Sequence, residues 1–141
     1  MKGIIFAILG GMFITLQGVV NAGISRDIGI LPAITVTQFT GFLLALTILL
    51  VVKDGSLTQL KTVKWPYLFA GSFGLLVIFN EVTAINMVGV TFTMAVILIS
   101  QIVMAFLIDT KGWFGLKKQK IKLPQIVGIS LMITGVIIIQ L

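Results

Sequence analysis

The chain contains no cysteine and no histidine among its 141 residues. These absences exclude disulfide bonds, thiol chemistry, haem ligation by histidine and the ordinary zinc sites, because each needs one of the two side chains. Carboxyl groups are scarce as well, which leaves little for hydrolytic chemistry. Four acidic residues serve the whole chain: Asp27, Asp54, Glu81 and Asp109. The sequence therefore predicts no metal site, no bound cofactor and no enzyme.

Charged residues of both signs are rare: they make up 10% of the chain, whereas an average soluble domain has about 25%. Hydrophobic residues make up 58%, and the mean hydropathy is +1.20. So few charges could not cover the surface of a water-soluble protein, so we predict a single integral membrane domain over residues 1–141. The net charge of +6 lies in short links between apolar runs, which suits contact with anionic lipid headgroups rather than nucleic acid.

Five long apolar runs predict an all-α membrane protein with five transmembrane helices. A barrel is not expected, because barrel strands alternate apolar and polar residues over about 10 positions. Each run has roughly the length that a helix needs to cross ~30 Å of hydrocarbon. The predicted spans are about 4–20, 31–52, 66–83, 90–108 and 123–141. A tight turn supplied by Asn86 and Gly89 separates the third span from the fourth. A cleaved signal peptide, with Lys2 as its basic start, is the alternative for the first span.

The basic residues are distributed asymmetrically between the two sides of these spans. Nine of the ten fall on the side of the N-terminus, and Arg26 lies alone on the other. Because such a bias over short loops sets orientation, we predict a cytoplasmic N-terminus and an external C-terminus. The nine are Lys2, Lys53, Lys61, Lys64, Lys111, Lys117, Lys118, Lys120 and Lys122.

Glu81 is the only ionisable residue predicted inside a span. Ionisable groups are costly in lipid and usually face a cavity or a partner helix. Burial favours the neutral form of a carboxyl group, which suits a residue that exchanges a proton for a cation. Two structural alternatives stay open: a protonated Glu81 that makes an interhelical hydrogen bond, or a span that ends earlier and leaves Glu81 in water.

Several amides share the depth of Glu81 or lie near it. At ~1.5 Å per residue, Gln17, Gln38 and Glu81 fall at one level, and Asn21 lies one turn beyond Gln17 on the same face. The candidate substrate- or ion-binding set is Glu81, Gln17, Asn21, Gln38, Gln101 and Ser100. These side chains either line a polar cavity or pair with one another as interhelical hydrogen bonds.

Motifs along nearly the whole chain resemble the YdcZ-like branch of the drug/metabolite transporter superfamily, which are small bacterial inner-membrane proteins. They are Gln17-Gly18, Asn21-Ala22, Gln38-Phe39 with Gly41, Gly71 and Gly74, Gly89, Ser100-Gln101 ending at Asp109, and Gly128 with Gly135. At Ser100 the family usually has Gly. Glu81 departs from the family, which has a small or apolar residue there, so a coupling role for Glu81 is not inherited.

The resemblance implies a multi-pass secondary transporter in the bacterial inner membrane that exports a small molecule, with a cation as one option. Larger relatives resemble two five-helix halves in opposite orientations, and inverted repeats support alternating access. One five-helix chain would then be half of such a fold and would work as a dimer. The partner is either an oppositely oriented paralogue or a second copy. The alternative function is a non-transporting membrane subunit or a holin-like pore former.

Overall fold

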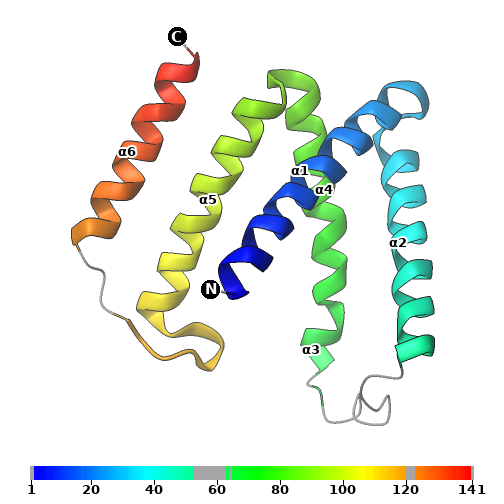
Figure 1. Ribbon diagram of the computed structural model, residues 1–141, viewed down its shortest axis with the longest axis horizontal. Coiled ribbons are helices and arrows are strands. Elements are labelled where there is room, and N and C mark those ends of the chain that lie inside the picture. Colours follow the sequence, from blue (N-terminus) through cyan, green and yellow to red (C-terminus); the bar gives the residue numbers. More distant parts are fainter. Residues whose placement is uncertain (1, 53–62, 64, 120–122, 141) are drawn as a thin grey trace. The chain divides into compact units, whose positions relative to one another are not determined.

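A computed structural model describes residues 2–52, 63, 65–119 and 123–140. Within these ranges every regular element is helical (Figure 1). The elements are α1 (Lys2–Ile28), α2 (Ile30–Val52), α3 (Trp65–Leu68), η2 (Phe69–Gly71), α4 (Ser72–Val88), α5 (Val90–Lys111), η3 (Trp113–Gly115) and α6 (Leu123–Gln140). Some predicted features lie outside the described residues: Lys53, Lys61, Lys64, Lys120, Lys122 and the span end at Leu141.

Four described segments are long and apolar enough to cross a membrane, which confirms an all-helical membrane fold at that level. They are Lys2–Ile28, Ile30–Val52, Phe69–Val88 and Val90–Lys111. The helix α6 is apolar but shorter: its 18 residues extend about 27 Å at ~1.5 Å per residue. Helices suit this chain because a backbone in lipid must satisfy its hydrogen bonds internally.

Single glycines join α1 to α2 and α4 to α5, so both turns are shorter than expected. Gly29 has φ +89° and Gly89 has φ +85°, values that favour glycine because it lacks a Cβ. The carbonyl of Gly29 accepts a bond from the Ala33 N–H at 3.2 Å, and that of Gly89 accepts one from Thr93 at 3.2 Å. The predicted turn residue Asn86 is not in the turn, because α4 continues to Val88.

The helices before these two turns are buried at matching positions. In α1 the buried residues are Gly18, Asn21, Ala22 and Ser25, and in α4 they are Ile78, Glu81, Val82 and Ile85. Each number in the second set is 60 above its counterpart, and so is Gly89 relative to Gly29. Asn21 and Glu81 are therefore equivalent positions, each eight residues before its turn glycine.

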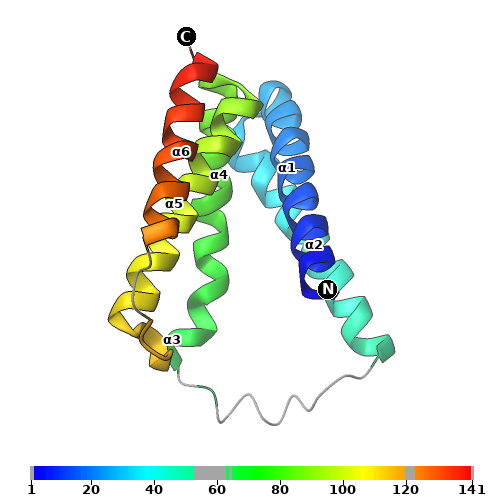
Figure 2. The ribbon, with the colours of Figure 1, turned by 60° about the vertical axis from the view of Figure 1, so that its left-hand side comes forward.

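Contacts divide the chain into two compact units, residues 1–87 and 88–141. In the first unit, α1 and α2 pack together and run in opposite directions from the Gly29 turn (Figures 1 and 2). The apolar core of this unit is made by Ala22, Ala33, Ile34, Ile78, Val82 and Ile85. These side chains come from α1, α2 and α4, so three helices enclose the core near the Gly29 turn.

The second unit is built on the packing of α5 against α6, which lie side by side (Figures 1 and 2). Gly135 lies at this interface, where residues of both helices line an apolar hollow of about 180 Å³. Gly112 ends α5 in a left-handed conformation, and its N–H donates to the carbonyl of Ile108 at 2.9 Å. The ammonium of Lys111 lies 4.9 Å from the centre of the Trp113 ring, within the range of a cation–π contact.

Candidate functional site

The first unit buries three polar side chains beside its apolar core. Asn21 is 0% exposed, Glu81 6% and Ser25 7%. Glu81 is the one ionisable side chain that is buried among the residues described. Polar groups at this degree of burial are costly unless they are hydrogen-bonded, so the partners of each atom decide its role.

A chain of hydrogen bonds joins the C-terminal ends of α1 and α4. Nδ2 of Asn86 donates to Oγ of Ser25 at 2.9 Å, and Nε of Arg26 donates to Oδ1 of Asn86 at 3.3 Å. Ser25 in turn donates to the carbonyl of Ala22 at 2.8 Å. The sequence reasoning missed this network because it ended the first span near Val20 and placed Asn86 in a turn.

The network fixes the register of the two helices. One turn before Ser25 on α1 is Asn21, and one turn before Asn86 on α4 is Val82, the neighbour of Glu81. Asn21 and Glu81 therefore lie at the same level, one turn inside the hydrogen-bonded ends. Nearer the start of α4, Nε2 of Gln38 lies 3.4 Å from the position a Cβ at Gly74 would take. That close approach shows that α4 also passes α2.

Asn21 and Glu81 have polar atoms that are fully enclosed and unpaired. Within the described part of the chain, Oδ1 and Nδ2 of Asn21 and Oε1 of Glu81 have no hydrogen-bond partner. An unsatisfied buried polar group costs about 1–3 kcal/mol. Two such groups at one level of one unit, at equivalent positions of two helices, form the candidate site, which we call the Asn21–Glu81 pair.

The other predicted site residues lie elsewhere. Gln17 and Gln38 are exposed in the first unit, and Gln101 and Ser100 are exposed on α5 in the second. Oγ of Ser100 donates to the carbonyl of Val96 at 2.9 Å, within its own helix. Because α1 runs to Ile28, Asn21 rather than Gln17 shares the level of Glu81. The signal for this was Gly29, the glycine directly before the next apolar run, which begins at Ile30.

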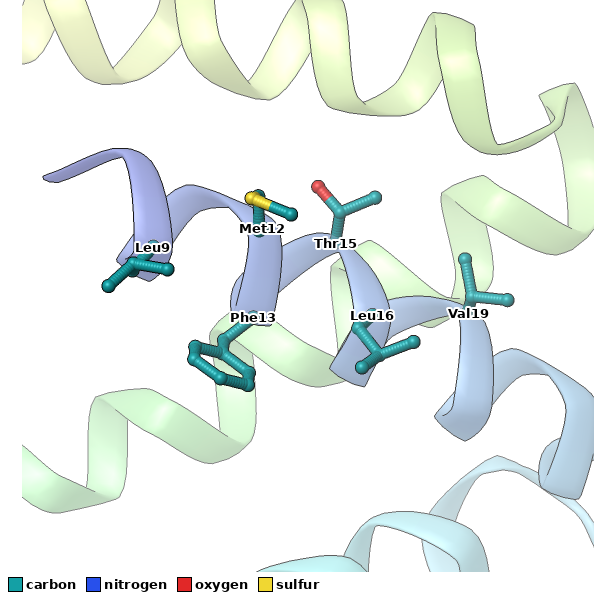
Figure 3. Close-up of a pocket in the computed structure, with 6 residues that line it drawn as sticks. All are labelled: Leu9, Met12, Phe13, Thr15, Leu16 and Val19. Atoms are coloured by element: carbon teal, nitrogen blue, oxygen red, sulfur yellow. The ribbon is translucent and has the colours of Figure 1, made fainter. Parts of the chain in front are cut away.

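A second feature of α1 is an open apolar surface (Figure 3). Its lining residues are Leu9, Met12, Phe13, Thr15, Leu16 and Val19. All of them come from α1, and the close-up shows side chains directed to opposite sides of this helix. A surface of this kind is what a helix presents to lipid, and it brings no convergent polar groups.

Several apolar helices of membrane-spanning length, with a buried polar pair among them, define a multi-pass membrane protein. The model of the family described as "Putative inner membrane exporter, YdcZ" matches residues 3–138, which is nearly the whole chain. The chain belongs to this family, and it is a multi-pass protein of the inner membrane. The family is one of transporters rather than enzymes. Comparison with curated proteins and with solved structures finds no match.

Proposed function

We propose that this protein is a secondary transporter that exports a small cationic molecule by alternating access, as one half of a dimer. The observation that carries the proposal is the Asn21–Glu81 pair, whose enclosed polar atoms lack partners. Membership of the exporter family agrees with it. Intramembrane ionisable residues commonly mark substrate or proton pathways, and transporter sites lie between helices that rock against one another.

Glu81 is the residue through which coupling takes place in this proposal. A buried carboxylate without a counter-ion is unfavourable, so either a proton or a cationic substrate must neutralise it. The two occupants exclude each other, and the exchange of one for the other drives export. The hydrogen bonds of Ser25 and Asn86 close the site at the Gly29 end of the helices. Opening that end requires these bonds to break.

Exposed amides on the helices support the dimer. Gln17, Gln38 and Gln101 are exposed, and their side chains have no hydrogen bond within the described residues. Amides in contact with lipid need partners, and a second protein supplies them. The lysine bias favours one orientation, N-terminus inside and C-terminus outside, so the partner that completes an inverted pair is an oppositely oriented paralogue. A second copy is the alternative partner.

Transport is tested in everted inner-membrane vesicles by following collapse of the proton gradient when small organic cations are added. We expect saturable collapse with the native chain and none with Glu81→Gln, which keeps the shape but removes the charge. Asn80→Gln is the matched control, because Asn80 is the exposed neighbour of Glu81 and its Nδ2 donates to Leu76 at 2.8 Å in its own helix. Unchanged transport by Glu81→Gln contradicts the coupling role. A conductance that does not saturate indicates a pore instead.

Orientation and partner are tested by thiol labelling, since the native chain has no cysteine to interfere. Gly3→Cys and Ile139→Cys place single thiols at exposed positions near the two ends. A membrane-impermeant maleimide is expected to label the first from the cytoplasmic side and the second from outside. Equal labelling from both sides contradicts a fixed orientation. Transport by the chain purified alone, in one orientation, contradicts the need for a paralogue.

A further inference from the structure

The unpaired atoms of the Asn21–Glu81 pair indicate which hydrogen-bonding groups a ligand must supply. Oδ1 of Asn21 and Oε1 of Glu81 are acceptors that lack donors, and Nδ2 of Asn21 is a donor that lacks an acceptor. Asn21 is 0% exposed and Glu81 6%, so neither side chain is satisfied at the surface. A ligand that belongs here must bring donors for two oxygens.

We propose that the Asn21–Glu81 pair binds a small cation that carries N–H donors, an ammonium or guanidinium group, and that it rejects quaternary ammonium. This inference rests on the proposed transport function and names the substrate class for the same site. One N–H of the ligand donates to Oδ1 of Asn21, and one or two donate to the carboxylate of Glu81.

Charge favours a cationic ligand over a neutral one. Hydrogen bonds between an N–H cation and a carboxylate are shorter and stronger than those between neutral groups. Arg26 is the nearest basic residue along α1, and its Nε is bonded to Asn86 one turn beyond the pair. Oε1 of Glu81 has no partner among the described residues, so a cationic ligand can serve as its counter-ion.

The walls of the site argue against quaternary ammonium. Proteins hold such ions against aromatic faces, because an ion without N–H groups cannot donate a hydrogen bond. The buried neighbours in the first unit are aliphatic: Gly18, Ala22, Ala33, Ile34, Ile78, Val82 and Ile85. A quaternary ion here would leave both oxygens unpaired, and no aromatic side chain is among the buried residues described in this unit.

Asn21 and Glu81 occupy equivalent positions on α1 and α4, yet one is an amide and the other is a carboxyl group. Each lies eight residues before its turn glycine, and the residue that follows it, Ala22 or Val82, is buried as well. A carboxyl group at both positions would place two negative charges at one level. An amide at one position keeps an acceptor there while leaving a single charge for one monovalent cation to balance.

The test measures transport currents from proteoliposomes on a solid-supported membrane, using the native full chain together with whatever partner it requires. The probes are guanidinium, methylammonium and tetramethylammonium, which share one charge and differ in N–H donors. We expect the first two to give currents at least about tenfold above tetramethylammonium, the ratio that corresponds to one lost hydrogen bond to a charged group. Asn21→Leu should reduce that preference, Glu81→Gln should remove all three currents, and Asn80→Gln should change nothing.

The possible outcomes separate this inference from the proposed function. Equal currents from all three cations, or a larger current from tetramethylammonium, overturn the N–H specificity and leave the exporter standing. No current from these cations, combined with Glu81-dependent transport of other compounds in everted vesicles, also overturns the specificity alone. Absence of transport in both assays overturns both proposals. Because Gln keeps the shape of Glu, a normally inserted Glu81→Gln protein makes a loss of current attributable to the missing charge.

Discussion

Replacing Asn21 by leucine should stabilise the protein and at the same time reduce its selectivity for N–H cations. The two side chains have the same branching, so the change mainly exchanges an amide for methyl groups. Asn21 is completely buried, and neither of its amide atoms has a partner in the described chain. The other fully buried residues of this unit, among them Ala33, Ile34 and Val82, are apolar, so leucine suits this core better than the native residue does.

The expected size of the effect follows from the unpaired amide. Leaving a buried polar group unsatisfied costs about 1–3 kcal/mol, and an apolar group of the same shape removes that cost. Leucine is slightly bulkier, and added volume in a packed core costs about 1–3 kcal/mol where the site cannot adjust. Gly18, one turn earlier on α1, is buried as well. We expect the removal of the unpaired amide to outweigh the added volume, with a net gain of up to about 2 kcal/mol in the free energy of unfolding.

The assay is titration of the detergent-solubilised protein with a denaturing detergent, followed by helical circular dichroism. Gln17→Leu is the matched control: it makes the same chemical change one turn earlier on α1, at an exposed position. Because Gln17 is exposed in the folded protein as it is in the denatured chain, its substitution should change the free energy of unfolding by less than about 0.5 kcal/mol. A clear loss of stability in Asn21→Leu beside a neutral Gln17→Leu would refute the reasoning. It would mean that the native amide makes a stabilising hydrogen bond.

Three further predictions concern backbone and packing. Gly89→Ala should lower the free energy of unfolding by about 1–3 kcal/mol, because φ +85° with ψ 166° is a conformation essentially restricted to glycine. Gly41 lies in the middle of a helix with open space around it, so Gly41→Ala should be neutral or should stabilise the protein by up to about 1 kcal/mol. If Gly89→Ala and Gly41→Ala changed the free energy of unfolding equally in the same titration, this explanation would be contradicted. Asn86→Ala removes the hydrogen bonds to Ser25 and Arg26, and each such bond typically contributes about 0.5–1.5 kcal/mol to stability. Amide hydrogen exchange at the C-terminal end of α4 should therefore become faster. Unchanged exchange would argue against this hydrogen-bond network. Gly135→Ala should raise stability by up to about 1 kcal/mol, since it adds a methyl group beside a hollow, and a measured loss would show that this face packs closely against something else.

The sequence was sufficient for the class of fold because lipid leaves the backbone few options. Long apolar runs in lipid can satisfy their N–H and C=O groups only as helices, and four of the expected spans are present at that length. The resemblance carried by Gln17-Gly18, Gln38-Phe39 and the spaced glycines correctly indicated the family that matches residues 3–138. Helix ends were less well predicted. Hydropathy falls where polar residues begin, whereas α1 continues through Arg26 to Ile28 and stops only at Gly29.

The candidate site was predicted as a set of residues, and packing decided which of them come together. Gln17 and Asn21 are amides one turn apart on α1, and nothing in their own sequence distinguishes them. Asn21 is buried, whereas Gln17 is exposed. The pairing of Asn86 with Ser25 depends on α1 and α4 meeting at their ends, a contact between residues 61 positions apart that local pattern cannot reveal. Composition thus determined the solvent and the helices, and tertiary packing determined which polar atoms are enclosed without partners, because burial depends on neighbours that are distant in sequence.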